Sequence, residues 1–315
     1  DYTAARNSCQ VRLMNQNLPT IDREICSGCG ACLSICPDRI LAADTLGKAL
    51  VNGGSCMQCG HCYAVCPVEA VSVPFLDQPE DLRSVKIESK GRPAEPLSPF
   101  GLLELMRQRR SCRLYLEETV DRVVLDDLVR AAVTAPSGTN SQGWKFIVLP
   151  AREQVIKLGE VTADFYRRLN RKASSLVLRS LLRLTGNNVL QTYYENYFET
   201  VKKALDEWDS AGEDRLFHGA PAAIVVAADK ASSCPGEDAL LASQNILLMA
   251  EALGLGSCLI GYVVEAARRD ASINRLLGLD KRYRVHSVIA LGQPAVKFMR
   301  PAGRKPLKPE IVTTV

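Results

Sequence analysis

The first part of the chain is decided by the stretch Cys26-Ser-Gly-Cys29-Gly-Ala-Cys32-Leu-Ser-Ile-Cys36-Pro37. The same spacing returns thirty residues later as Cys56-Met-Gln-Cys59-Gly-His-Cys62-Tyr-Ala-Val-Cys66-Pro67. Three cysteines separated by two residues wrap one iron–sulfur cube, and the fourth, after a gap of three, ligates the other cube. The spacing therefore predicts two [4Fe-4S] clusters. Their expected ligands are Cys26, Cys29, Cys32 and Cys66 for one, and Cys56, Cys59, Cys62 and Cys36 for the other.

Two other structures could use these cysteines, a pair of zinc knuckles or a disulfide framework. Zinc needs no third and fourth cysteine at this spacing, and no secretory leader opens the sequence, so both are disfavoured. Over roughly residues 20–75 the chain instead resembles a bacterial two-cluster ferredoxin domain.

The composition is that of an ordinary globular protein, with 315 residues, 47% of them hydrophobic and 23% charged. This length predicts about two domains with a sizeable buried core. No run of eighteen apolar residues occurs, so no membrane span is expected. The net charge of +4 gives no reason to expect a nucleic-acid partner. Twelve cysteines, eight of them predicted thiolate ligands, favour a reducing, low-oxygen cytoplasm.

The chain divides into segments of different composition. Residues 1–19 show no periodicity and are expected to form a tail or wrapping arm, and residues 20–75 form the cluster domain. Residues 76–97 contain Pro79, Pro93 and Pro96, which is typical of an extended linker. Residues 98–315 form a second domain.

Hydrophobic periodicity predicts both helices and strands in this second domain. Ser98 and Pro99 form a good helix start, and Pro136 ends a later helix. Interspersed strands and helices predict an α+β sandwich. The expected helices are 98–110, 121–135, 238–253 and 265–278, with a long helical region over about 152–212; the expected strands are 145–149, 222–228, 257–260 and 285–291. Short helices are also expected at 33–36 and 63–66 in the cluster domain.

Four separated pieces of this domain agree with one family. They are Arg109–Arg113, Ala135–Trp144, Gly254–Gly261, and Ala290–Pro294 with Arg304–Leu307 after it. Together they look like the FMN-dependent nitroreductase family, over about residues 98–315. The resemblance implies an α+β sandwich that dimerises and binds FMN, so a homodimer is expected.

The resemblance also implies which residues bind the flavin. Its phosphate needs arginine and hydroxyl donors, and the matching residues are Arg109 and Ser111, with Arg304. Arg113 matches the cation at the N1 and C2 carbonyl edge, where positive charge stabilises reduced flavin. Ile260 and Gly261 are expected on the flavin face near N5. Arg110 and Leu259 are also expected among the flavin-binding residues. Pro136, Ser137, Gly138, Asn140 and Gln142 are expected along the ring edge of the other subunit's flavin.

Two departures from the family pattern stand out. The stretch 212–219 holds Glu213, Asp214 and Arg215 where relatives often carry an Asn and a basic residue, and it does not align safely. A basic residue expected just before Arg304 is replaced by Ala302. Phosphate binding is therefore expected to rely on Arg109 and Arg304.

The helical region 152–212 lies where this family varies the lid over its flavin. We expect either a roof that selects substrate, with Tyr193, Tyr194 and Tyr197 on the substrate side, or helices packed on the dimer. The basic stretch 167–183 fits a solvated face, an anionic substrate, an acidic donor protein or membrane lipid. No dedicated catalytic side chain is expected, because flavin supplies the chemistry. The three histidines, His61, His218 and His286, are expected to be structural.

These observations predict an oxidoreductase that takes electrons from reduced ferredoxin or flavodoxin through the clusters to FMN. The small-molecule acceptor is a nitro compound, a quinone or an activated C=C bond. Nicotinamide is disfavoured as the donor, because hydride can reach flavin without any cluster, and no G-x-G-x-x-G motif follows a strand. Two alternatives stay open: a dedicated flavin-dependent dehydrogenase or reductive dehalogenase, and a non-catalytic electron carrier or redox sensor.

Overall fold

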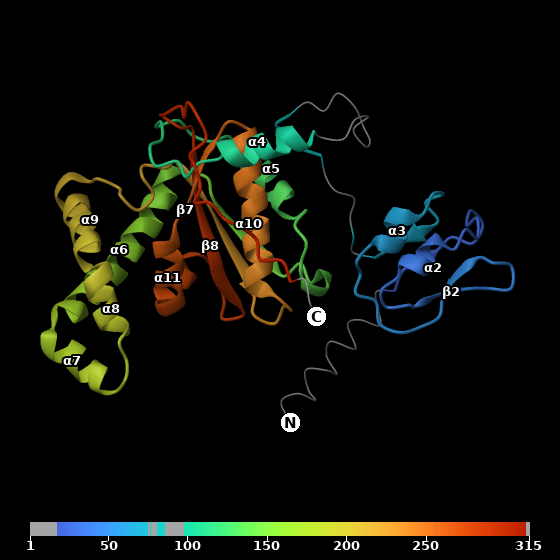
Figure 1. Cartoon of the computed structure of the whole chain (residues 1–315), viewed down its shortest axis with the longest axis horizontal. Coiled ribbons are helices and arrows are strands. Elements are labelled where there is room, and N and C mark those ends of the chain that lie inside the picture. The colour runs from blue at the N-terminus through green and yellow to red at the C-terminus, as the bar shows by residue number, and fades with distance from the viewer. Residues whose placement is uncertain (1–17, 75, 77–80, 86–97, 313–315) are drawn as a thin grey trace. The chain divides into compact units, whose positions relative to one another are not determined.

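The computed structural model of the chain describes residues 18–74, 76, 81–85 and 98–312 (Figure 1). The predicted tail therefore lies outside the described residues except for its last two positions. The chain forms two compact units. The first holds residues up to 80 together with Pro136–Gln142 and Ser232–Cys234, and the second holds the rest.

The first unit has two antiparallel strand pairs and two short helices. Strand β1 (Thr20–Ile21) pairs with β4 (Val71–Ser72), and β2 (Leu41–Ala43) pairs with β3 (Ala49–Val51). Helices α2 (Ala31–Ile35) and α3 (His61–Val65) each start two residues earlier than predicted. They follow Gly30 and Gly60, whose φ angles of 74° and 72° favour glycine and turn the chain into each helix.

The second unit is built on a four-stranded sheet in the order β5-β6-β8-β7, with every neighbouring pair antiparallel. The strands are β5 (Trp144–Leu149), β6 (Ala222–Asp229), β7 (Gly256–Leu259) and β8 (Tyr283–Gly292). The sequence predicted all four strands to within two residues.

Strand β6 shows why this unit has three layers. All eight of its residues are buried, and alternate side chains enter two different cores. Ala223, Val225 and Ala227 pack with α6 (Arg152–Ser174) and α11 (Gly261–Arg269). Ile224 and Val226 pack with α5 (Arg122–Ala132) and α10 (Pro235–Ala252). Side chains alternate along a strand, and β6 is apolar at every position before its last residue, Asp229, so it needs a cover on both faces. The predicted α+β sandwich is confirmed.

One predicted helix is split in two. The range 265–278 is occupied by the end of α11 and by α12 (Ala271–Leu276). The break falls at Asp270, whose carboxylate accepts a hydrogen bond from the Ser272 amide at 2.8 Å. An aspartate at this position caps a new helix start, so it ends one helix and begins the next.

Helix α4 (Pro99–Gln108) begins as predicted, with the Ser98 hydroxyl accepting a hydrogen bond from the Gly101 amide. No residue of this helix is buried. Phe100, Leu102, Leu103 and Met106 are all exposed, so its apolar face has no cover within the described part of one chain.

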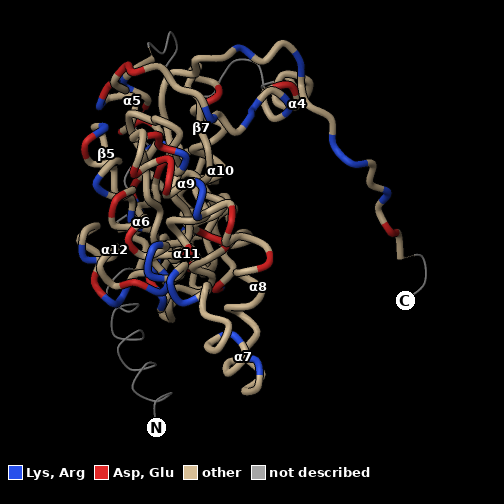
Figure 2. The backbone as a smooth tube through the Cα atoms, turned by 90° about the vertical axis from the view of Figure 1, so that its left-hand side faces the viewer, with Lys and Arg blue, Asp and Glu red and all other residues tan. Residues whose placement is uncertain are grey.

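The long helical region is confirmed as α6 followed by α7 (Leu176–Leu184), α8 (Val189–Asn196) and α9 (Phe198–Ala211). Figure 1 shows α6 to α9 together at one side of the sheet. At the other end of the chain, residues 300–312 form neither helix nor strand and are exposed. Figure 2 shows this stretch leading away from the sheet and helices.

Part of the predicted linker belongs to the second unit. The Asp127 carboxylate on α5 accepts hydrogen bonds from the amides of Arg83 and Ser84 and from the Ser84 hydroxyl. Residues 81–85 are thereby fixed to α5, whereas most of 76–97 lies outside the described residues. Within the described chain, no helix combines the length and the hydrophobicity that crossing a bilayer requires.

Candidate functional site

The cysteines of the first unit surround two small cavities. Cys26, Cys29, Cys32 and Cys66 line one of them. Cys36, Cys56, Cys59 and Cys62 line the other. These are the two sets that the spacing predicts, with the last cysteine of each motif crossing over to the other set. The exchange arises because α2 and α3 pack side by side.

The backbone around these cavities suits an anionic iron–sulfur group. The Gln58 amide donates a hydrogen bond to Cys56 Sγ at 3.3 Å, and the Ala70 amide donates one to Cys66 Sγ at 3.2 Å. Amide donors to cluster sulfurs are among the levers that set cluster potential. Four thiols around each cavity match the donor set of a [4Fe-4S] cluster, so the residues fit that group.

The loop predicted to border a flavin of the other subunit is part of this first unit. The Asn140 side chain donates a hydrogen bond to the Gln58 carbonyl at 2.6 Å, and Gln58 lies between two predicted cluster ligands. Ser137 Oγ accepts a hydrogen bond from the Gln142 amide. The sidechain-free Gly138 lies close to Cys234, which a Cβ atom there would approach to 3.0 Å. The expected position of Pro136, Ser137, Gly138, Asn140 and Gln142 along a flavin edge therefore stays a prediction.

That cavity, the main cavity, has a volume of about 860 Å³ and lies between the sheet and the helical region. Arg113, Cys258, Leu259, Ile260 and Gly261 line its sheet side, and residues of α6 and α8 line the opposite side. Pockets of 300–1,000 Å³ are typical of cofactor and substrate sites. The predicted flavin residues Arg113 and Leu259–Gly261 therefore meet in one cavity.

Local pairing explains how these two segments meet. The Cys112 amide donates a hydrogen bond to the Ser257 carbonyl at 2.9 Å, and Ser111 forms a parallel bridge with Ser257. The Ile260 amide donates a hydrogen bond to the Val288 carbonyl, which fixes this residue, and Gly261 then starts α11. The amides at a helix start carry partial positive charge and favour an anionic or carbonyl partner.

The stretch that did not align, 212–219, also reaches the main cavity. Its centre is Asp214, whose carboxylate accepts hydrogen bonds from the amides of Leu216 and Phe217 at 3.0 and 2.8 Å. Arg152 on α6 pairs with the same carboxylate at 2.7 Å. The loop so formed places Arg215 and His218 in the lining of the cavity, although the pattern of 212–219 predicted a binding role for neither.

His218 has a φ angle of 58°, a left-handed conformation that is uncommon for a side chain of this type. Burial lowers the pKa of His218, and the nearby guanidinium groups of Arg113 and Arg215 lower it further. The imidazole is therefore neutral at pH 7 and faces the cavity. The expectation that His218 is structural stays a prediction, but its place in the cavity lining was not foreseen; the turn-forming Gly212 and Gly219 on either side of the loop were the available signal.

Tyrosines line the opposite side of the main cavity. Tyr193 and Tyr197 lie there as predicted, joined by Tyr166 and Tyr262, which the sequence analysis did not single out. The Tyr166 hydroxyl donates to the Tyr262 carbonyl at 3.0 Å, and the Tyr193 hydroxyl donates to Asn170 at 2.7 Å. Burial raises the pKa of both phenols, so they remain protonated.

Tyr194 does not line the cavity. Its ring packs on Phe198 at 4.8 Å between centroids and lies under the Arg179 guanidinium at 3.5 Å. Neighbouring residues of a helix point about 100° apart, so Tyr193 and Tyr194 face different surroundings, and the expected substrate-side role of Tyr194 is not supported.

The predicted phosphate residues, and Arg110 beside them, lie outside the main-cavity lining. Arg109, Arg110 and Ser111 precede Arg113 and are half-buried. Burial raises the pKa of Glu251 on α10, and the charge of Arg109 and a hydrogen bond from the Arg110 amide offset part of this rise. Arg304 is exposed, with its guanidinium donating to the carbonyls of Ala302 and Gly303. Within the described residues of one chain, Arg304 does not join the other three.

Comparison with known families agrees with this division. Residues 106–293 match the model of the nitroreductase family, and residues 18–67 match that of a 4Fe-4S dicluster domain. The second match covers both cysteine motifs.

Individual relatives carry related names. A putative NADH dehydrogenase/NAD(P)H nitroreductase of Methanothermobacter thermautotrophicus is 30% identical over 63% of this chain and 80% of its own. An iodotyrosine deiodinase of Thermotoga neapolitana is 24% identical over 61% of this chain and 88% of its own. Among solved structures, a Bacteroides fragilis nitroreductase with bound FMN superposes with a TM-score of 0.48 at 21% identity, covering 68% of this chain and 98% of that one.

Proposed function

Because the chain belongs to the nitroreductase family and carries a 4Fe-4S dicluster domain, we propose that it is an FMN-dependent oxidoreductase that passes electrons from a low-potential donor through two [4Fe-4S] clusters to an organic acceptor. The observation that carries this proposal is the main cavity, in which Arg113 and Leu259–Gly261 face a wall of tyrosines. The two four-cysteine cavities of the same chain supply the route for electrons.

The residues of the main cavity fit a flavin ring and a flat acceptor. Arg113 offers positive charge to the N1 and C2 carbonyl edge of a ring, and the start of α11 offers amide donors. Bound FMN supplies the ability to accept single electrons and to release them in pairs. The tyrosine rings, with neutral hydroxyls tied to protein acceptors, offer aromatic faces on which a planar acceptor can stack.

Acceptors of this class take up protons as well as electrons. His218 is half-buried in the cavity beside Arg113, and its lowered pKa leaves it neutral at pH 7. A neutral imidazole can donate one hydrogen bond to an acceptor oxygen while accepting another. We assign His218 to hold the acceptor's polar group next to the flavin.

The second subunit is part of the proposal. Helix α4 exposes Phe100, Leu103 and Met106. The exposed C-terminal stretch 300–312, which contains Arg304, leads away from the sheet and helices (Figure 2). Neighbouring exposed apolar side chains on one helix are typical of an association surface. A homodimer would cover α4 and could bring Arg304 to the partner's phosphate site.

The test uses the whole protein, purified without oxygen and reduced with dithionite. Menadione or nitrofurazone is added, and flavin absorbance is followed. Rapid reoxidation with loss of the acceptor supports the enzyme, whereas reoxidation only by a protein acceptor supports an electron carrier. Replacing dithionite by NADH and then by reduced ferredoxin tests the proposed donor, since fast reduction by NADH alone would contradict the route through the clusters.

Reductive dehalogenation is a second candidate, favoured by the similarity to iodotyrosine deiodinases. Cleaving an aryl–iodine bond needs two electrons and a proton and releases iodide, so the same parts would serve. Iodide release from 3-iodophenol by the reduced protein, faster than menadione reduction, would favour this activity over the first.

A further inference from the structure

A second cavity adjoins the main one. This side pocket, of about 290 Å³, lies between α6 and α9. Five residues line both cavities: Tyr166, Arg215, Leu216, His218 and Tyr262. At 290 Å³ the side pocket is at the lower limit for a whole small-molecule ligand, so its size suits one part of a molecule whose remainder lies in the main cavity.

The walls of the side pocket are mainly apolar. Ala163, Val201, Ala204, Leu205 and Trp208 supply hydrocarbon and an indole ring. Trp208 can lie against α6 because position 159 is glycine, where a Cβ atom would come within 2.9 Å of the indole. The absence of a side chain at Gly159 of α6 thus lets the Trp208 indole form one wall of the side pocket.

Two hydroxyls of the walls already donate hydrogen bonds to the protein backbone. The Thr162 hydroxyl donates to the Leu158 carbonyl at 2.7 Å, and the Tyr166 hydroxyl donates to the Tyr262 carbonyl at 3.0 Å. Hydroxyls that are bonded to the backbone make no demand on an occupant. The interior therefore offers mainly apolar contact, and a polar ligand buried there would lose its hydrogen bonds to water without replacing them.

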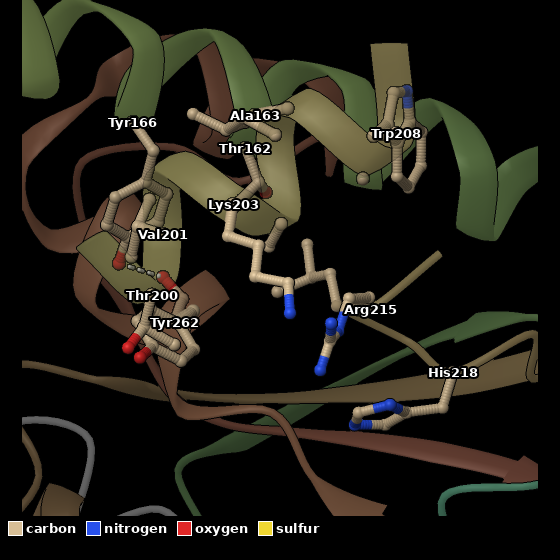
Figure 3. A pocket seen from close by; sticks show the side chains of 14 residues that line it. Thr162, Ala163, Tyr166, Thr200, Val201, Lys203, Trp208, Arg215, His218 and Tyr262 are labelled. Atoms are coloured by element: carbon tan, nitrogen blue, oxygen red, sulfur yellow. Dashed lines mark hydrogen bonds between the residues drawn. The ribbon is translucent and has the colours of Figure 1, made fainter. Parts of the chain in front are cut away.

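Charged groups mark one side of the side pocket. Arg215 and Lys203 share the Glu207 carboxylate, with N···O distances of 2.7 and 3.7 Å. Figure 3 shows the Lys203 amine and the Arg215 guanidinium approaching each other, with the His218 ring nearby and Trp208 farther along the pocket. Because Glu207 already pairs with both cations, this side gives no strong attraction for a further anion.

We propose that the side pocket takes an apolar arm of the acceptor, so that the preferred substrate is a reducible ring carrying a prenyl or alkyl chain. This inference rests on the proposed function, because the ring must lie in the main cavity. His218 and Tyr262, which line both cavities, stand where the ring joins its arm.

The test compares menadione with 2-methyl-3-prenyl-1,4-naphthoquinone, which has the same ring and adds a five-carbon prenyl arm. Ala204→Leu puts a larger side chain into the side pocket, and Ala211→Leu makes the same change at an exposed position of α9. The ratio of kcat/KM for the prenyl quinone to that for menadione should fall about tenfold in A204L, given the worth of buried methylene groups, and stay at the wild-type value in A211L. Each acceptor serves as its own reference, so differences in potential cancel.

A second measurement does not depend on A204L folding. The chain has two tryptophans, so Trp144→Phe leaves Trp208 as the single indole. The prenyl quinone should quench Trp208 fluorescence at about one-tenth of the menadione concentration. Equal quenching, or an unchanged kcat/KM ratio in A204L, would overturn the apolar-arm proposal while leaving the reductase intact. Failure to reduce either quinone would instead overturn the proposed function.

Discussion

The Arg152 guanidinium lies 2.7 Å from the Asp214 carboxylate, and this ion pair links α6 to the loop that carries Arg215 and His218 into the main cavity. Asp214 is 4% exposed and also accepts amide hydrogen bonds from its own loop. One carboxylate therefore fixes both the backbone of the loop and its position on the helix.

Asp214→Asn should loosen this loop. An asparagine keeps one acceptor oxygen but loses the charge, so we expect the free energy of unfolding to fall by about 1–3 kcal/mol and menadione reduction to slow. Thermal unfolding and kcat/KM measure the two effects. Asp206→Asn, an exposed carboxylate on α9, is the control and should change neither; a D214N protein with wild-type kcat/KM would show that the loop needs no such anchor.

Asp127 predicts a pH-dependent stability. Burial raises its pKa, but hydrogen bonds from Ser84 and from the Arg83 amide, with the Arg130 charge, more than offset this and lower the pKa from 3.8 to about 2. In the folded state Asp127 therefore stays ionised at pH values at which the same residue is protonated in the unfolded chain. Its contribution to stability is complete above about pH 4 and is lost as the pH falls toward 2.

Asp127→Asn should accordingly cost about 1.5–3 kcal/mol at pH 6, the range for hydrogen bonds to a charged group. Urea unfolding followed by circular dichroism should show the difference from wild type shrinking between pH 4 and pH 3. A gap that stays constant over this range would mean that the charge of Asp127 is not what stabilises α5 and residues 81–85.

Cys36 allows the cluster pairing to be tested. It lines the cavity of the second motif, with Cys56, Cys59 and Cys62. Wild-type protein should contain about eight irons and one FMN, and Cys36→Ser should lower the iron content towards about four while FMN is retained. Cys234→Ser, at an exposed cysteine outside both cavities, should keep all the iron. Loss of FMN together with iron from C36S would show that the two units do not fold independently.

Arg113 should tune the flavin. A positive charge at the N1 edge stabilises the reduced, anionic form, so Arg113→Gln is expected to lower the two-electron midpoint potential by roughly 20–40 mV, equivalent to about 1–2 kcal/mol. Spectroelectrochemistry provides the value. Arg122→Gln, which removes an exposed arginine at the start of α5, is the matched control. An unshifted potential in R113Q would remove this arginine from the flavin edge.

The exposed face of α4 predicts the oligomeric state. Met106 is 44% exposed, and a buried charge without a partner is costly at an interface. Met106→Glu should therefore shift the protein from dimer to monomer in size-exclusion chromatography coupled to light scattering, with weaker FMN retention. Gln108→Glu, at an exposed position at the end of the same helix, tests whether added negative charge alone has this effect; a monomeric wild-type protein would contradict the homodimer.

Much of the fold could be read from local patterns. The spacing of cysteines predicted the two sets that line the cavities, because three ligands of each cube are separated by only two residues and the fourth comes from the other copy of the same motif. Strands β5 to β8 were predicted from apolar runs, since β6 is covered on both faces and needs hydrophobic residues throughout. The pieces around Arg113 and Ile260 were recognised because backbone and charge requirements of a flavin site are local in sequence.

The rest depended on contacts between distant segments. His218 and Arg215 join Arg113 because Asp214 pairs with Arg152, 62 residues away, and no pattern in 212–219 records that partner. Tyr193 and Tyr194 point in different directions because successive helical side chains are about 100° apart. Only the packing of α8 decides that Tyr193 lines the main cavity and that Tyr194 lies against Phe198 and Arg179. The side pocket exists because Gly159 of α6 meets Trp208 of α9. The sequence by itself thus determined the two sets of cysteines and the layers of the second unit, whose requirements lie within short stretches, whereas the shape of the main cavity was decided by tertiary contacts between residues far apart in the chain.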